Sequence, residues 1–395
     1  MENFTFSHPT RIHFGRGEEN HVGDRIRRRG GTRVLIHYGG TSAVKSGLIY
    51  RVTRSLERAG LATFPLGGVL PNPRSGHVRN GIELCRKENI DFILAVGGGS
   101  VIDSAKAIAL GAAYTGDFWD FFDGKAIPTT VLPVASVLTI AAAGSEVSPV
   151  TVITREDGML KRHYSSERIR PVFAVMNPEL TITVPPYQTA SGATDMMAHV
   201  IERYFTNTTG VELTDRLCEA VMLTIRTEVP RVLKDPGNYD ARANLMWAGA
   251  IAHNDICGVG REQDWASHAL EHELSGLYDC AHGAGLAVIL PAWMEYVMQH
   301  DIARFAQFAV RVWGCDMNFA HPETTARAGI DAFRAFLRQI GMPTSFADIR
   351  AREEDIPTLI DKLHLGHNTL GAFVKLDRND CENIYRLACR QTTAP

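Results

Sequence analysis

Short apolar runs alternate with amphipathic stretches along the first half of the chain. The runs have the length of strands, and the stretches between them place apolar residues at helical spacing. The runs lie at residues 34–38, 61–66, 92–96 and 131–137, and the helical stretches lie at about 44–59, at about 74–88 and from 101 onward. The run at 92–96 is apolar throughout, which is typical of a strand buried on both faces of a parallel sheet. This alternation predicts an α/β fold with a Rossmann-like parallel sheet.

The second half of the chain has a different pattern. After Pro185-Pro186, helical periodicity dominates and runs of β-branched residues nearly vanish. The chain has 395 residues, which is enough for two hydrophobic cores. We therefore expect an N-terminal α/β domain over residues 1–184 and an all-α C-terminal domain over residues 185–395.

Composition and charge exclude several classes of function. The formal net charge of −3 offers nothing that would recruit nucleic acid or an anionic membrane. We see no signal region and no apolar stretch long enough to cross a bilayer. The seven cysteines are scattered and include no Cys-x-x-Cys pair, so neither a disulfide framework nor a zinc ribbon is expected. We expect a reducing, cytoplasmic location.

A glycine loop follows the apolar run at 92–96 and leads directly into a helical stretch. Its residues are Gly97, Gly98, Gly99 and Ser100. Successive glycines let backbone N–H groups approach an anion, and a helix start adds further donors. The loop is not G-x-G-x-x-G, because Ile102 stands where the third glycine would fall. The loop indicates phosphate binding, and a tight turn without a ligand is the alternative.

An aromatic segment at residues 117–124 lies where a Rossmann fold would place an acidic residue that contacts the ribose. Asp117 and Asp120 are acidic, but no strand precedes them to carry them to the sheet edge. The segment either lines an apolar substrate pocket or packs against the domain, and the pattern leaves both open.

Histidines and one aspartate recur at helical spacing in the second half. Asp195 and His199 are four residues apart and share one helix face, as do His268 and His272. His282 follows a short loop-like stretch. Carboxylates and imidazoles are ligands for a divalent metal, which can polarise a carbonyl group. Any one of these histidines by itself is more often an ordinary core or surface residue, and the two pairs together with His282 leave both interpretations open.

The segment His268 to His272 also fits the H-x-x-E-H pattern of inverted zinc proteases, with Glu271 as the general base. This short pattern arises readily by chance, and it gives the glycine loop and the α/β half no role. We keep the protease as the less favoured alternative.

Taken together and in order, these segments resemble the iron-containing (group III) alcohol dehydrogenase family over nearly the whole chain. The resemblance is greatest to its branch of butanol dehydrogenases and NADPH-dependent aldehyde reductases. The segments that carry it are residues 71–73, 95–100 with Asp103, 144–146, 194–199, 263–268, His272 and 282–283.

The resemblance implies an NAD(P)-dependent enzyme that transfers a hydride between the nicotinamide and a small alcohol or aldehyde. It implies a dinucleotide-binding α/β domain, a metal-binding helical domain and assembly as a homodimer. The implied ligands of an Fe²⁺ or Zn²⁺ ion are Asp195, His199, His268 and His282. His272 corresponds to an additional active-site histidine, a candidate proton relay or substrate contact.

The resemblance also implies the residues that bind the nucleotide. The glycine loop at 97–100 would hold the pyrophosphate, and Asn72, Asp103, Thr139 and Lys161 are further cofactor-binding positions. Many relatives carry threonine before the Gly-Ser-Glu triplet, whereas this chain has Ala143. We therefore expect one hydroxyl contact to the cofactor to be missing.

A second turn bears on the choice of nucleotide, and its residues are Gly39, Gly40, Thr41 and Ser42. In this family the end of the preceding strand faces the adenosine ribose, where an acidic residue would repel a 2′-phosphate. No acidic residue occurs between His37 and Tyr50, and Lys45 could add a positive charge. We predict that NADP is preferred over NAD. A tight turn that only opens a helix is the alternative.

Two sister activities and one non-enzymatic role remain as alternatives. One is a related metal enzyme, a glycerol-dehydrogenase-like polyol dehydrogenase. A cyclase of the dehydroquinate synthase type would need a cluster of basic phosphate ligands near the metal, which we do not find. The intact Asp/His set argues against a nucleotide-binding sensor that has lost its metal.

Overall fold

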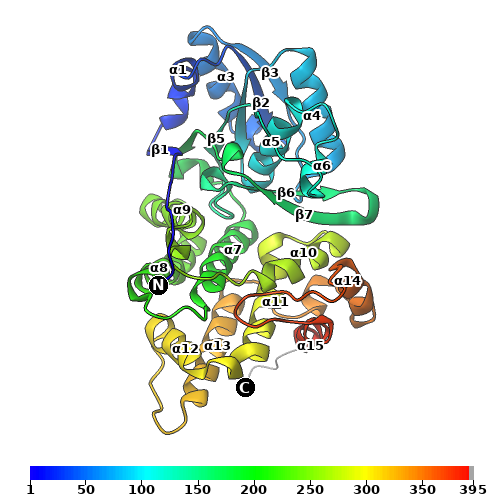
Figure 1. The fold of residues 1–395 in the computed structure, drawn as a ribbon. Helices are drawn as coiled ribbons and strands as arrows, with labels where there is room; N and C mark the ends of the chain where they lie inside the picture. Colours follow the sequence, from blue (N-terminus) through cyan, green and yellow to red (C-terminus); the bar gives the residue numbers. More distant parts are fainter. Residues whose placement is uncertain (391–395) are drawn as a thin grey trace. The chain divides into compact units, whose positions relative to one another are not determined.

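The computed structural model describes residues 1–390, and the chain divides into two compact units (Figure 1). One unit is Ser7–Val184, and the other is Pro185–Pro395 together with Met1–Phe6. We expected residues 1–6 to belong to the α/β domain. Their backbone instead pairs within the helical unit, because the amino group of Met1 donates to the Thr209 carbonyl at 2.7 Å and Glu2 N–H donates to the Gly260 carbonyl at 2.9 Å.

The unit Ser7–Val184 is built on a six-stranded sheet in which all neighbouring strands are parallel. The strand order is β1-β8-β5-β4-β2-β3. The strands are β1 Arg11–Phe14, β2 Arg33–Tyr38, β3 Ala62–Leu66, β4 Phe92–Gly97, β5 Val134–Leu138 and β8 Phe173–Met176. The helices of this unit are α1 Val22–Arg27, α2 Ser42–Lys45, α3 Leu48–Arg58, α4 Ser75–Lys87, α5 Gly99–Ala112 and α6 Trp119–Phe122. The α/β fold with a parallel sheet that the sequence predicted is confirmed.

Strand β4 lies inside the sheet and is buried along its whole length. Its alternate residues Leu94 and Val96 join Val34 and Ile36 of β2 in one hydrophobic core cluster. Parallel strands covered on both faces need apolar residues at every position, which explains the uninterrupted apolar run in β4. The central strands are therefore those with the clearest signal in the sequence.

The strand order creates a switch point between β2 and β4. The chain leaves β2 to form β3 on one side, whereas β4 pairs with β2 on the other side, with Tyr38 in register with Val96. In open parallel sheets, ligands bind beyond the carboxyl ends of the strands at such a point. The loops that follow β2 and β4 are therefore placed for ligand binding.

Four strands had no recognisable pattern in the sequence. Strand β1 is a short edge strand of half-exposed residues, and β8 has only four residues. The antiparallel hairpin of β6 (Val150–Arg155) and β7 (Leu160–Ser165) mixes polar and apolar residues. Such short or partly exposed segments give weak periodicity.

The aromatic segment at 117–124 packs against its own unit. Trp119 and Phe121 of α6 are buried, and the ring of Trp119 stacks on that of Phe122 with 4.7 Å between the centroids. Tyr164 of the β6–β7 hairpin lies 5.7 Å from the Phe121 ring. Of the two readings that the sequence left open, these contacts favour packing over a substrate pocket.

The second unit is helical throughout its described part, with no named strand between residues 185 and 390. Its helices are α7 Pro186–Tyr204, α8 Glu212–Lys234, α9 Tyr239–His253, α10 Ala266–Tyr278, α11 His282–Val297, α12 Ile302–Phe308, α13 Pro322–Gln339, α14 Ile356–Lys362 and α15 Arg378–Cys389. Helix α7 begins at Pro186, because the first turn of a helix tolerates a residue without an N–H. None of the described helices combines the length and apolar character needed to cross a bilayer.

Candidate nucleotide site and metal centre

Two glycine segments meet at the carboxyl edge of the sheet. Gly39 directly follows β2 and Gly97 ends β4, and these two strands are hydrogen-bonded neighbours. A Cβ atom on Gly39 would lie 3.5 Å from a methyl group of Val101 in α5, so the two turns are in contact. The N–H of Thr139, after β5, donates to the Gly97 carbonyl at 3.1 Å and brings a third strand end to the same edge.

The turn after β4 leaves no room for a Cβ atom at its glycines. A Cβ on Gly97 would lie 2.5 Å from Val101, and a Cβ on Gly98 would lie 2.2 Å from Ile140. Gly98 is the N-cap of α5, and among the described residues no side chain caps this helix. The first turn also carries no acidic residue. The start of this 14-residue helix can therefore accept an anion on its backbone N–H groups.

Asp103 is buried in α5 and points into the protein. Its carboxylate accepts hydrogen bonds from the Ser145 hydroxyl and from the Val152 N–H, the latter at 3.0 Å. Burial raises the pKa of Asp103, although Lys106 and the hydrogen bonds oppose this rise. These contacts support the loop after β5. The expected contact of Asp103 with the cofactor stays a prediction.

Lys106 lies one helical turn further along α5 and is completely buried. Its ammonium group donates to the carbonyls of Ser145, Ser148 and Val150 at 2.7, 2.9 and 2.7 Å, and to the Ser145 hydroxyl at 2.9 Å. Burial lowers the pKa of Lys106 to about 8, although the carboxylates of Asp103 and Glu146 oppose this change. One buried cation thus fixes the loop that carries the Gly-Ser-Glu triplet.

The remaining expected nucleotide contacts lie on several loops. Gly40, Thr41 and Ser42 are exposed where α2 begins. Asn72 is buried with a left-handed backbone (φ 50°), and Lys161 is buried on β7, where its charge acts on Asp103. Ala143 lies beside the glycine loop, since a Cβ on Gly99 would approach it to 3.2 Å.

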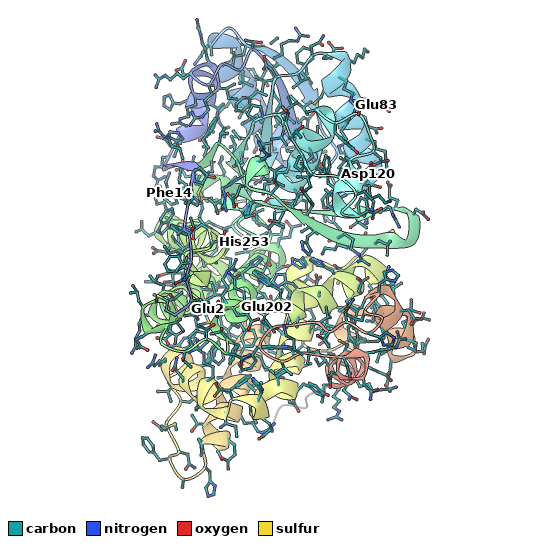
Figure 2. The ribbon with its side chains drawn as sticks, in the orientation of Figure 1. Glu2, Phe14, Glu83, Asp120, Glu202 and His253 are labelled. Carbon is teal, nitrogen blue, oxygen red and sulfur yellow. The ribbon has the colours of Figure 1, made fainter. Side chains whose placement is uncertain are left out.

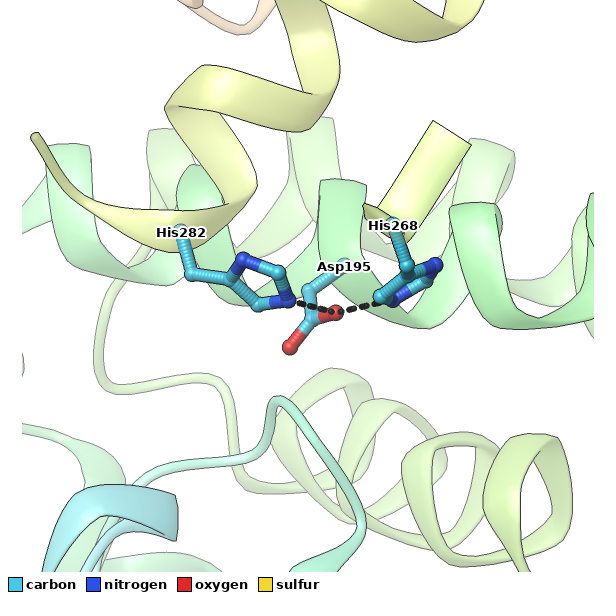
Figure 3. A group of neighbouring side chains, drawn as sticks. All are labelled: Asp195, His268 and His282. Carbon is cyan, nitrogen blue, oxygen red and sulfur yellow. Dashed lines mark ion pairs between the residues drawn. The ribbon is translucent and has the colours of Figure 1, made fainter. Parts of the chain in front are cut away.

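Three donor groups converge in the helical unit. Asp195 lies in α7, His268 in α10, and His282 is the first residue of α11 (Figure 3). The Nε2 atoms of His268 and His282 each lie 3.6 Å from Oδ1 of Asp195, and the three donor atoms lie within 4.8 Å of one another. Ligands about 2.0–2.2 Å from a tetrahedral ion lie roughly 3.3–3.6 Å apart. The separations from Asp195 match that geometry.

His199 lies beside this group. Its Nδ1 atom is 3.5 Å from Oδ1 of Asp195, one turn earlier in α7. Its ring stacks between those of His268 and His253, with centroid distances of 4.6 and 4.1 Å. His199 is not a member of the group whose donor atoms all lie within 4.8 Å of one another. A movement of its ring would be needed for it to act as a fourth ligand.

Several buried polar atoms of this histidine and aspartate group have no hydrogen-bond partner. Within the described part of the chain these include Oδ1 of Asp195, Nδ1 of His199 and Nε2 of His268. Each such atom costs about 1–3 kcal/mol unless it finds a partner. A carboxylate oxygen and imidazole nitrogens with free lone pairs are suited to a shared cation, so the residues present fit a divalent metal.

Two buried glutamates contact the outer nitrogens of these histidines. A carboxylate oxygen of Glu202 accepts a hydrogen bond from Nδ1 of His268, and one of Glu271 accepts from Nδ1 of His282. Glu202 lies among the helices of this unit (Figure 2).

No sequence pattern pointed to Glu202, and the pattern around Glu271 suggested another role. Glu202 follows His199 by three residues on α7, and this same-face spacing is the signal that could have revealed it. In the protease alternative Glu271 would be a general base. The structure instead buries it against His282, so the H-x-x-E-H reading loses its base.

His272 lies at the border of the centre and is partly exposed. Its ring is edge-on to that of His268, with 6.4 Å between centroids, and lies 5.6 Å from that of His282. One donor atom each from Glu271, His272 and His282 also lie within 4.8 Å of one another. His272 therefore faces the same centre from its exposed side.

Two aromatic rings and one arginine lie next to His199 and His268, and no sequence pattern predicted that they contact one another. Trp265 has a left-handed backbone (φ 67°), and its ring is edge-on to His268 at 5.3 Å. The buried guanidinium of Arg203 lies over the Trp265 ring at 4.6 Å and donates to Nδ1 of His253 at 3.2 Å. His253 in turn stacks on His199, with 4.1 Å between the ring centroids.

Known proteins match this chain over both units. The iron-containing alcohol dehydrogenase family matches residues 9–178, and the C-terminal family of Fe-containing alcohol dehydrogenases matches residues 189–389. A probable NADH-dependent butanol dehydrogenase of Bacillus subtilis is 41% identical over 98% of this chain and 99% of its own length. The NADPH-dependent aldehyde reductase YqhD of Escherichia coli is 38% identical over 98% of this chain and 100% of its own length.

A solved structure extends the similarity to the fold. The crystal structure of NADH-dependent butanol dehydrogenase A from Thermotoga maritima is 40% identical, covers 99% of both chains and has a TM-score of 0.96. The family is thus matched in sequence across the sheet edge and the histidine cluster, and in structure along nearly the whole chain. The chain belongs to the iron-containing alcohol dehydrogenase family.

Proposed function

We propose that this chain reduces small aldehydes and oxidises the corresponding alcohols at a metal centre made by Asp195, His199, His268 and His282. As a member of its family, the chain is an oxidoreductase that acts on CH–OH groups with NAD(P) and a divalent metal. The observation that carries the assignment of these ligands is the convergence of unpartnered buried donor atoms on Asp195.

The proposed centre suits either Fe²⁺ or Zn²⁺, because a carboxylate and imidazoles bind both ions. When bound, the ion would supply a Lewis acid that polarises the oxygen of the substrate. The protein's own contribution is to hold the ligands and to exclude water around buried Asp195 and His268.

The metal assignment is tested by removing single ligands. We expect Asp195→Ala and His268→Ala to lose both bound metal and turnover while the folded structure persists. The matched control is His321→Ala, because His321 is an exposed histidine of the same unit. Metal content by mass spectrometry and activity with a panel of aldehydes, alcohols and glycerol provide the readout. Wild-type metal content in either ligand variant would refute the assignment, and a strong preference for glycerol would favour the polyol alternative.

For the nucleotide, we propose that the pyrophosphate binds at the start of α5, with Asn72, Asp103, Thr139 and Lys161 as further cofactor-binding residues. We further propose that NADPH is preferred over NADH, because Thr41 and Ser42 are exposed beside Gly39 and no acidic residue accompanies them. The relatives do not decide this choice, since NADH-dependent and NADPH-dependent enzymes have similar identity to this chain. Comparing kcat/KM for the two nucleotides tests the preference.

His272 is proposed as the group that moves a proton during the reaction. Its support is its position one turn after His268, with partial exposure toward solvent. A histidine there can exchange a proton with water and with a bound substrate. The role predicts a change in the pH profile when the side chain is removed.

Assembly and location complete the proposal. We propose a homodimer in the cytoplasm that acts on small molecules and binds neither nucleic acid nor membranes. The support for a reducing compartment is that the seven cysteines are scattered along the chain and include no Cys-x-x-Cys pair. Light scattering after size-exclusion chromatography tests the dimer.

A further inference from the structure

Carboxylates connect the three helices that supply the candidate ligands. Helix α7 carries Asp195 and also Glu202, whose carboxylate reaches His268 on α10. Helix α10 carries Glu271, whose carboxylate reaches His282 on α11. Helix α7 thus provides the hydrogen-bond acceptor for the histidine of α10, and α10 provides the one for the histidine of α11. Both glutamates are fully buried.

The two contacts define the tautomer of each histidine. A carboxylate accepts only, so Nδ1 of His268 and Nδ1 of His282 must carry the hydrogen. The opposite atom, Nε2, is the one that faces Oδ1 of Asp195 at 3.6 Å in both cases. Each glutamate therefore keeps the lone pair of Nε2 directed at the centre.

Glu202 holds His268 at two points. Besides Nδ1 of the ring, its carboxylate accepts the backbone N–H of His268 at 3.1 Å. This pair of contacts fixes the ring relative to its own backbone, near the start of α10. Glu202 therefore controls the orientation of the imidazole and not merely its protonation.

Glu271 depends on a glycine in the neighbouring helix. A Cβ on Gly285 of α11 would lie 2.6 Å from Oε1 of Glu271, so only glycine leaves the carboxylate in its present position. A Cβ on Gly283 would lie 1.9 Å from the carbonyl of Ser191 in α7, which shows how closely the two backbones approach. The start of α11 is packed so that His282, Glu271 and Asp195 come together.

We propose that Glu202 and Glu271 are positioning residues of the metal centre. Each carboxylate fixes, across a helix–helix contact, the tautomer and ring orientation of a histidine, so retention of the metal depends on the packing of α7, α10 and α11. Gly285 contributes to the same arrangement, because the absence of a side chain leaves space for the carboxylate of Glu271. This inference rests on the proposed metal site.

The test measures the affinity for Zn²⁺ by competition with a chromophoric chelator. We expect Glu202→Gln and Glu271→Gln to bind Zn²⁺ about 10–100-fold more weakly than the wild type, as is typical when such outer carboxylates are removed. Gly285→Ala should weaken binding in the same direction although every carboxylate is retained, because the new methyl group displaces Glu271. The control is Glu219→Gln, since Glu219 is buried in the same unit but contacts Tyr204 and Arg216.

A second measurement does not depend on the folding of any variant. In wild-type protein loaded with Zn²⁺, ¹⁵N NMR of the imidazoles should show both His268 and His282 protonated at Nδ1. A proton on Nε2 of either histidine would overturn the proposal, as would glutamine variants whose affinity stays within twofold of the wild type.

The failure of this inference can be separated from failure of the metal site itself. If Asp195→Ala abolishes Zn²⁺ binding while the glutamine variants bind normally, only the positioning role is refuted. If Asp195→Ala binds Zn²⁺ as tightly as the wild type, the proposed site is refuted and the positioning role falls with it.

Discussion

Replacing Lys106 with methionine tests how the α/β unit stabilises the loop beside the glycine turn. Lys106 is completely buried, and its ammonium group makes four hydrogen bonds to the segment from Ser145 to Val150. Methionine has a similar length but donates nothing. The variant therefore leaves buried carbonyl groups without donors, and it removes the charge that most strongly opposes the rise in the pKa of Asp103 caused by burial.

The expected loss of stability follows from these contacts. Each buried acceptor left without a donor costs about 1–3 kcal/mol, so the loss of these contacts together should cost about 3–5 kcal/mol. A unit of this size loses roughly 2–4 °C of its Tm for each kcal/mol. We therefore expect the melting temperature of Lys106→Met to fall by about 6–20 °C. Nucleotide affinity should fall as well, because the loop lies beside Gly97 and Gly99.

The assay is thermal unfolding followed by circular dichroism, together with nucleotide titration by fluorescence. Lys87→Met is the matched control, because the Lys87 side chain is 79% exposed in the same unit and should leave the Tm within about 1 °C. A Tm of Lys106→Met that equals the wild-type value would refute the view that this cation holds the loop.

Four further predictions concern the two candidate sites. Burial raises the pKa of Glu146 to about 7 from the ordinary 4.5, so its contribution to stability is complete below about pH 4.5 and is lost as the pH rises through 7. Glu146→Gln should therefore remove roughly 3 kcal/mol of pH dependence from urea unfolding between these values, and an unchanged slope would contradict the burial argument. Gly39→Asp fits sterically, because its Cβ would lie 3.5 Å from Val101. The variant should shift the NADPH/NADH ratio of kcat/KM about tenfold or more toward NADH, because the new carboxylate repels the 2′-phosphate. An unchanged ratio would show that this turn does not contact the ribose. Gly98→Ala should destabilise the protein by about 1–3 kcal/mol in denaturant unfolding, because its methyl group would lie 2.2 Å from Ile140, whereas Gly40→Ala has open space and should not. His272→Ala should keep its metal but lose about 10²–10⁴-fold in kcat with an altered pH profile, and loss of the metal would make His272 a ligand instead.

Local patterns in the sequence were sufficient to predict the central strands and the turns that follow them. Strand β4 could be recognised because a strand buried on both faces must be apolar at every position. The turns at Gly39 and Gly97 were recognisable because glycine is needed where backbones and side chains approach closely, as the short Cβ distances at Gly97 show. The spacing of Asp195 and His199 likewise reflects a helical face within one segment.

The sequence did not reveal features that depend on pairing between distant segments. The short β1 and β8 lack a clear periodicity, and the order β1-β8-β5-β4-β2-β3 arises from packing of whole strands and helices. The direction of the Asp103 side chain also depends on Ser145 and Val152, which are far away along the chain. A local pattern reports which residues are buried but not what they are buried against.

The candidate metal centre shows the same division most clearly. The sequence by itself identified Asp195, His268 and His282 by residue type, spacing and resemblance. Only the tertiary structure revealed that Glu202 and Glu271 contact the outer nitrogens of the two histidines, since each contact joins two different helices. Helical periodicity determines the face on which a side chain lies, whereas the partner of that face is decided by how the helices pack, which no single segment encodes.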